Sequence, residues 1–364
     1  MFGNLSSLTF MMACTSALIA SLGCLLCIYL LKPIAIRIGL LDSPDPQGEG
    51  RKQHLQPVPP IGGVAIFFGF SLALLSFPIS LRPCRWLIAG SVILLLMGIV
   101  DDCRNLSAKL RLWGQIAVAL LLVMGGTILV TLGVAWPGVP LFLGILAIPC
   151  TVLFVVINLN AMNMIDGQDG LAGGIALSQA GWLWYCAWAL QAKSELYLLN
   201  TLCAALIVFL AFNMRFPWQK HARIFMGDAG STCIAFILSG IAISLSQKTP
   251  TLISPLFLLW ILALPLFDLF NVVLHRIKVG RSVVTAGRDH VHHILSLRGM
   301  KTGLSTFVLC SLSITLGGIG FLLNYFSVPE GVQLVLFLIV LWGYLHLIRL
   351  GRCQKSVQLE LESC

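Results

Sequence analysis

Long hydrophobic segments recur along this chain, and they restrict its fold more than any other feature. Segments of about 20 apolar residues match the roughly 30 Å hydrocarbon core of a bilayer. The chain is 58% hydrophobic and 10% charged, whereas in ordinary globular proteins about a quarter of the residues are charged. We therefore predict an all-α polytopic membrane protein in which residues 1–364 form a single domain.

Hydropathy predicts eleven membrane-spanning helices. They cover residues 10–31, 61–80, 86–100, 112–130, 141–158, 171–190, 196–213, 230–247, 253–275, 304–323 and 332–349. With the N-terminus outside, the outer loops contain only four of the 23 Lys and Arg residues, namely Arg82, Arg85, Lys193 and Lys248. The positive-inside rule therefore predicts an outside N-terminus and a cytoplasmic C-terminus.

The net charge of +9 does not predict a nucleic-acid partner. The basic residues flank apolar segments, as expected at a membrane surface. The sequence contains no basic stripe interleaved with exposed aromatic residues, which is typical of nucleic-acid binding.

An acidic pair, Asp101 and Asp102, follows the third predicted span on the cytoplasmic side. Adjacent carboxylates repel each other unless a cation lies nearby. Mg²⁺ prefers carboxylate oxygens and substrate phosphates, and one carboxylate could act as a general base. The alternative is a solvated helix end, although acids there oppose the helix dipole.

Two more acids, Asp166 and Asp169, lie in the segment Asn163–Gly170, which also falls on the cytoplasmic side. If this segment is helical, their spacing of three places them on one face. Asn163 adds a neutral donor and acceptor. A polar turn between two spans is the alternative, since Asn, Asp and Gly commonly form turns.

The segment Met226–Ser231 opens the eighth predicted span and contains Asp228. Helix N-termini favour anions, and flanking glycines allow a ligand to approach the backbone. Asp228 is therefore a candidate cation ligand beside a phosphate site, or else only a helix N-cap. Phe225, just outside, is a candidate for stacking on a base.

Three of the seven His residues, His290, His292 and His293, lie within four positions of one another, next to Arg288. Such a run could bind zinc, hold a diphosphate or protonate a leaving group, or it could be a polar surface loop. Lys52 lies in a separate basic loop. It is a candidate phosphate contact or part of a patch for anionic lipid headgroups.

In this order, four motifs resemble those of the polyprenyl-phosphate N-acetylhexosamine-1-phosphate transferases. They are Val-Asp-Asp at 100–102, Asn-Met-Ile-Asp-Gly-Gln-Asp-Gly-Leu at 163–171, Phe-Met-Gly-Asp-Ala-Gly-Ser at 225–231 and Arg-Asp-His-Val-His-His at 288–293. The likeness covers nearly the whole chain. The His-x-His-His run resembles the WecA-type branch, which moves GlcNAc-1-phosphate onto undecaprenyl phosphate, rather than the MraY-type branch.

The resemblance implies a Mg²⁺ cofactor, with Mn²⁺ as an alternative, at the cytoplasmic face. The implied metal site consists of Asp228, Asn163 and Asp166. The implied catalytic residues are Asp101, Asp102, Asp166 and Asp228, with one of the first two as base. The implied substrate-binding residues are Lys52, Asn163, Asp169, Phe225, Arg288, His290, His292 and His293, with Asp169 and Phe225 at the uracil.

The implied reaction moves N-acetylglucosamine 1-phosphate from UDP-GlcNAc to undecaprenyl phosphate, with release of UMP, in the bacterial cytoplasmic membrane. The product would start a lipid-linked glycan such as O-antigen. Relatives often carry an acid where this chain has Gly287, and here the acid follows the Arg, as Asp289. Sugar choice therefore stays open, including UDP-MurNAc-pentapeptide, and so does a homodimer.

Two other classes fit less well. An intramembrane prenyltransferase would be expected to have two Asp-rich motifs with a spacing of four, which this chain lacks. A secondary transporter would be expected to carry ionisable residues near the membrane midplane. Here the acids cluster at span ends, apart from Asp268 in the ninth predicted span.

Overall fold

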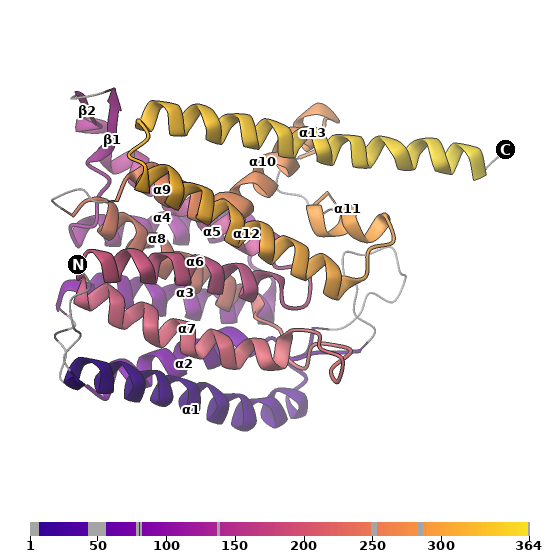
Figure 1. Cartoon of the computed structure of the whole chain (residues 1–364). Helices are drawn as coiled ribbons and strands as arrows, with labels where there is room; N and C mark the ends of the chain where they lie inside the picture. Colours follow the sequence, from indigo (N-terminus) through magenta and orange to yellow (C-terminus); the bar gives the residue numbers. More distant parts are fainter. Residues whose placement is uncertain are drawn as a thin grey trace.

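The computed structural model describes residues 7–42, 56–77, 80, 82–136, 139–248, 253–282, 287 and 289–362. It is a helical bundle with most of its helices along one common direction (Figure 1). The long helices are α1 (Ser7–Arg37), α2 (Gly62–Leu75), α3 (Arg85–Arg104), α4 (Ala108–Met124), α5 (Ala147–Ile165), α6 (Leu171–Ala189), α7 (Lys193–Asn213), α8 (Gly227–Ser246), α10 (Ala263–Lys278), α12 (Thr302–Tyr325) and α13 (Glu330–Glu362). The short ones are η1 (Arg82–Cys84), η2 (Gly144–Leu146), α9 (Pro255–Ile261) and α11 (Val291–Leu297).

The helices confirm a polytopic membrane architecture. Each of the eleven predicted spans coincides with a long helix or, for the ninth, with the pair α9 and α10. Within the described ranges, seven helices are long and apolar enough to cross a bilayer, or eight if α9 and α10 form one span. Helix α2 has only 14 residues, less than the roughly 20 that a full crossing needs. The number of eleven spans therefore stays a prediction.

The ninth predicted span is broken rather than continuous. Helices α9 and α10 meet at an angle of 72°. Pro265 lies in the first turn of α10. A proline ring clashes with the carbonyl four residues earlier and lacks an N–H donor, so a single straight helix through Ile261 is not available to this sequence. The break places the rest of α10 beside α5.

The all-α prediction is wrong at one place. Residues Thr131–Trp136 (β1) and Val139–Phe142 (β2) form an antiparallel hairpin, in which Thr131 pairs with Phe142. β-Branched residues such as Thr131 favour strands. The side-chain amide oxygen of Gln247, at the end of α8, accepts hydrogen bonds from the N–H groups of Val130 and Thr131 at 3.0 and 3.1 Å. The hairpin therefore caps the bundle at the end opposite α11 (Figure 1).

Helix α8 forms the centre of the bundle and is almost completely buried. Small residues allow the backbone of its first turns to contact the backbones of α2 and α3. A Cβ added to Gly63 would collide with the backbone of Gly230, and one added to Gly98 would collide with Ala229. The N–H groups of Gly62 and Gly63 also donate to the carbonyls of Phe225 and Met226 at 2.8 and 2.9 Å. These contacts fix the N-termini of α2 and α8 side by side.

Candidate active site

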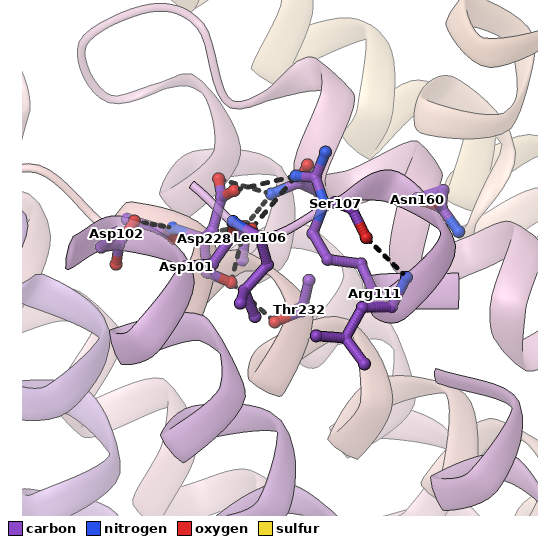
Figure 2. Close-up of polar contacts among 12 residues, drawn as sticks. Asp101, Asp102, Leu106, Ser107, Arg111, Asn160, Asp228 and Thr232 are labelled. Carbon is purple, nitrogen blue, oxygen red and sulfur yellow. Dashed lines mark hydrogen bonds and ion pairs between the residues drawn. The ribbon is translucent and has the colours of Figure 1, made fainter. Parts of the chain in front are cut away.

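The acidic motifs converge at the end of the bundle where α3 and α5 finish and α8 begins. Asp101 and Asp102 lie in the last turn of α3, and Asp228 lies in the first turn of α8. The N–H of Asp228 donates to Oδ1 of Asp102 at 3.0 Å, across 126 positions of sequence (Figure 2). Carboxylates oppose the dipole at a helix C-terminus, but here they face the N-terminus of α8, which favours negative charge.

A basic residue, Arg111 of α4, lies between two of these acids. Its Nη1 atom donates to Oδ2 of Asp101 at 3.1 Å and to Oδ2 of Asp228 at 3.3 Å (Figure 2). The other oxygen of Asp101 accepts from the N–H of Leu106 at 2.6 Å. Asp101 is only 6% exposed, whereas the Arg111 side chain is 37% exposed. The guanidinium thus offsets two carboxylate charges and stays accessible to a ligand.

Asn163 and Asp166 bring the end of α5 to the same place. The amide nitrogen of Asn163 donates to Oδ1 of Asp228 at 2.8 Å and to Oγ of Ser231 at 3.0 Å. Asp166 is the C-cap residue, directly after the last residue of α5. Residues 166 and 167 are not helical, residue 168 is a bend and residues 169 and 170 form a turn, so Asp166 and Asp169 do not share a helix face.

Two cavities meet at this acidic cluster. The first has a volume of about 430 Å³ and the second of about 410 Å³. Both are lined by the same four residues, Asp101, Asp166, Gly167 and Asp228. The middle of a ligand that fills both cavities would therefore lie at these four shared residues.

The first cavity contains two of the predicted base-recognition residues, Asp169 and Phe225. Oδ2 of Asp169 accepts from Nε of Arg215 at 2.7 Å and from the N–H of Ala222 at 3.2 Å. Asn213 fixes the two motifs to each other, because it accepts from the N–H of Gly170 and donates to the carbonyl of Ile224, both at 2.8 Å. The carboxylate of Asp169 therefore already has two protein partners, and Arg215 shares the wall of this cavity.

The second cavity is lined by all three predicted His residues, His290, His292 and His293. All three are buried, and the rings of His292 and His293 lie 4.2 Å apart between centroids. A Cβ added to Gly167 would lie 2.5 Å from Nε2 of His292. The His segment therefore packs directly on the turn that carries Asp166 and Asp169.

Two predicted site residues, Lys52 and Arg288, lie outside the described residues. The structure places the other predicted residues around the two cavities or in contact with residues that line them.

Comparison with known proteins identifies the family. Residues 84–246 match the model of glycosyl transferase family 4. The undecaprenyl-phosphate alpha-N-acetylglucosaminyl 1-phosphate transferase of Yersinia pestis is 32% identical over 324 residues, 87% of each chain. The protein of that name in Escherichia coli K12 is also 32% identical, over 87% of this chain and 86% of its own. A Bacillus subtilis relative, named a probable undecaprenyl-phosphate N-acetylglucosaminyl 1-phosphate transferase, is 34% identical over 77% of this chain and 76% of its own.

The chain belongs to glycosyl transferase family 4. It is therefore a membrane-embedded glycosyltransferase, and the resemblance drawn from the four motifs is confirmed.

The side chains of this family 4 transferase suit a hard divalent cation. Mg²⁺ binds through one or two carboxylates and keeps several waters or phosphate oxygens, and Asp228, Asn163 and Asp166 offer oxygen atoms of this kind. Within the described part of the chain, no three His, Cys, Asp or Glu side chains form a ready metal site. Among the described residues, the three His side chains thus do not form a ready zinc site.

Sequence reasoning missed Arg111 and Arg215 as site residues, as well as Arg276, which lines the second cavity. It also missed Asp268, which lies outside both cavities but contacts His290. The three Arg residues look like ordinary positive-inside flanks, because each follows or precedes an apolar segment. Asp268 did carry a signal, since an acid within a predicted span is costly unless it has a partner or a function.

Proposed function

We propose that this transferase moves N-acetylglucosamine 1-phosphate from UDP-GlcNAc to undecaprenyl phosphate and releases UMP. The observation that carries the proposal is the meeting of two cavities at Asp101, Asp166 and Asp228, with Arg111 beside them. The relatives' names supply the acceptor and the transferred group. The cavities supply separate spaces for a nucleotide and a sugar.

The donor then lies with its uridine in the first cavity, where Phe225 stacks on the base. Aromatic stacking contributes roughly 1–3 kcal/mol per base. Asp169 and Arg215 both line this cavity, and Nε of Arg215 donates to Oδ2 of Asp169 at 2.7 Å. The sugar lies in the second cavity near His290, His292 and His293, and the diphosphate crosses the acidic cluster between them.

The acceptor enters through the second cavity. The wall of this cavity includes apolar residues. Among them is Leu112 of α4, which is 45% exposed and suits contact with a prenyl chain. Arg111 is one position away, and a guanidinium binds phosphate oxygens with charge-assisted hydrogen bonds. The acceptor phosphate therefore lies beside the β-phosphorus of the donor.

The reaction is a displacement at phosphorus. An anionic oxygen of the lipid phosphate attacks the β-phosphorus, the bond to the α-phosphate oxygen breaks, and UMP leaves with that oxygen. Arg111 and the N-terminus of α8 stabilise the charge on the transferring group. Bound Mg²⁺, or Mn²⁺ in its place, would supply further neutralisation and in-line orientation. The acceptor is already an anion near neutral pH, so direct attack needs no strong base.

The site faces the cytoplasm in this proposal. The eleven-span topology, with the N-terminus outside and the C-terminus inside, places this end of the bundle at the inner surface of the cytoplasmic membrane. The hairpin at the other end then faces outward. Cysteine labelling of single-Cys variants at Lys109 and at Val139 in intact cells tests this topology, because a membrane-impermeant reagent should label only the Val139 variant.

The direct test measures UMP release from UDP-GlcNAc by the purified protein, with and without undecaprenyl phosphate. Release that requires the lipid, with transfer of labelled sugar into a lipid fraction, supports the proposal. Release with another UDP-N-acetylhexosamine or UDP-MurNAc-pentapeptide, but not UDP-GlcNAc, would correct the sugar. No release from any donor would refute the activity.

The mass of the detergent complex tests the homodimer that the sequence leaves open.

A further inference from the structure

A buried acid outside both cavities contacts the His segment. Asp268 lies in α10 after the bend and is 1% exposed. Its Oδ2 atom lies 2.8 Å from Nδ1 of His290, and its Oδ1 accepts from the N–H of Val291 at 2.8 Å. One carboxylate thus holds both the His290 ring and the backbone that follows it. A buried carboxylate is costly unless it is paired in this way.

The peripheral helix α13 supports the same contact. The hydroxyl of Tyr344 lies 3.4 Å from Oδ1 of Asp268. Nη2 of Arg352 donates to the carbonyl of Asp289 at 2.6 Å, and the amide of Asn271 donates to that carbonyl at 3.3 Å. Residues of α10 and α13 therefore hold His290 and the residue before it from two sides.

The geometry decides which nitrogen of His290 can serve a ligand. A carboxylate accepts a hydrogen bond, so the short contact favours a proton on Nδ1. His290 lines the second cavity, whereas Asp268 does not. Nε2 is then the ring nitrogen left for the cavity. The carboxylate fixes both the tautomer and the orientation of the ring, as a second partner does for a catalytic imidazole.

We propose that Asp268 is a positioning residue for the transfer reaction. It binds Nδ1 of His290 and so presents Nε2 to the sugar-diphosphate in the second cavity. This inference rests on the proposed function for the identity of the ligand, but the contact itself does not depend on it. A purely structural ion pair is the rival explanation.

The substitution Asp268→Asn separates these explanations. An amide keeps the shape of the carboxylate but has only one acceptor oxygen. Its NH₂ group must face either the N–H of Val291 or Nδ1 of His290. The first arrangement places the NH₂ group against the N–H of Val291, so that two donors face each other. The second moves the ring proton of His290 to Nε2. Either result disturbs His290 while little volume changes.

A double-mutant cycle on UMP release provides the main test. We expect Asp268→Asn to lower kcat about a hundredfold, a typical effect when one oriented group that stabilises the transferring phosphate is lost, with KM for UDP-GlcNAc changed less than about threefold. In a His290→Gln background the same substitution should lower kcat less than about twofold, because Asp268 acts through His290. An equal loss in both backgrounds would assign Asp268 a structural role and overturn the proposal.

Glu195 provides a matched control. It is another buried acid, it forms an ion pair with Lys248 at 2.8 Å, and it lies in the first turn of α7. Asn213, which lines the first cavity, ends that helix about 27 Å away at 1.5 Å per residue. Glu195→Gln removes a buried charge far from the site, so kcat should stay within about twofold of the parent protein.

A second measurement does not require any activity. The ¹⁵N shifts of the His290 ring in the full-length protein, assigned by comparison with His290→Gln, report which nitrogen carries the proton. We expect a protonated Nδ1 in the parent protein and a different state in Asp268→Asn. A neutral ring protonated only at Nε2 in the parent protein would overturn the inference. If the protein releases no UMP from any donor, the proposed function fails. The ¹⁵N shifts would still decide which nitrogen of His290 carries the proton.

Discussion

Nη1 of Arg111 lies 3.3 Å from Oδ2 of Asp228, although 117 positions separate them in sequence. The same nitrogen lies 3.1 Å from Asp101. A cation at this place lowers the repulsion between carboxylates that α3 and α8 bring together. Arg111 thus supplies a positive charge at the point where the proposed reaction would develop negative charge.

Replacement of Arg111 by Gln should lower kcat about a hundredfold, because a charged donor to the transferring phosphate is lost. The guanidinium is 37% exposed, but its partner Asp101 is only 6% exposed, so the melting temperature should fall as well, because a buried carboxylate loses its cation. Steady-state kinetics and a thermal melt of the purified protein measure both effects.

Lys109→Gln is the control for this substitution. Lys109 lies two positions away on α4, is exposed, and lines neither cavity. It carries the same charge, so a general loss of surface charge would affect both variants. Equal activity of the two variants would remove Arg111 from the site.

Asp228→Asn should reduce turnover to less than about 1% of the parent rate, since the carboxylate charge at the junction of the cavities is lost. The amide is nearly isosteric, and its oxygen can still accept from Asn163 as Oδ1 does at 2.8 Å. The protein should therefore insert and melt normally. Substantial UMP release by this variant in washed membranes would exclude Asp228 as a cation ligand.

Removal of divalent cations should abolish UMP release, and added Mg²⁺ or Mn²⁺ should restore it. The side-chain oxygens of Asp228, Asn163 and Asp166 suit hard cations, and among the described residues no three His, Cys, Asp or Glu side chains form a ready metal site. We therefore expect Mg²⁺ to raise the melting temperature clearly only when UDP-GlcNAc is also present. A large stabilisation by Mg²⁺ alone would contradict this dependence on substrate oxygens.

Gly167→Ala should lower activity about tenfold or more, because the new Cβ would lie 2.5 Å from Nε2 of His292 and displace the His segment. Gly181→Ala, within α6, is the control, since nothing lies within 4 Å of its added Cβ. That variant should keep its activity and gain up to about 1 kcal/mol of stability from helix propensity. Matched kinetics of the two variants would show that the packing of His292 on Gly167 is unimportant.

Phe225→Ala should raise KM for UDP-GlcNAc about tenfold through lost stacking, with a smaller change in kcat. Phe225→Trp should retain most of the affinity because it keeps an aromatic face. Titration of UMP, which lacks the sugar, checks that the loss concerns the nucleotide. An unchanged KM in Phe225→Ala would remove this residue from base recognition.

Hydropathy predicted where the apolar helices lie along the sequence, because a span must bury about 20 apolar residues in lipid, whereas the number of eleven spans stays a prediction. It did not predict the hairpin at Thr131–Phe142 or the bend before Ala263. Both depend on local chemistry, β-branched residues in one case and Pro265 in the other. A hydropathy window averages such features away.

The site was predictable where acids interrupt apolar sequence, as at Asp101, Asp102 and Asp228. Their convergence could be inferred from the shared membrane side, and the structure brings them together. The partners were not predictable in the same way. Arg111 and Arg215 resemble other flanking basic residues, and only the packing of α4 and of the loop after α7 shows which carboxylates they meet.

The close approach of Gly63 to Gly230, and of Gly98 to Ala229, has a mechanical consequence. Where backbones touch, their separation depends on atomic radii and not on rotamers. Changes in lipid thickness that tilt the outer helices α1, α12 and α13 should therefore leave the spacing of Asp102 and Asp228 almost unaltered. The rigid centre would keep the catalytic geometry constant while the perimeter adapts to different bilayers.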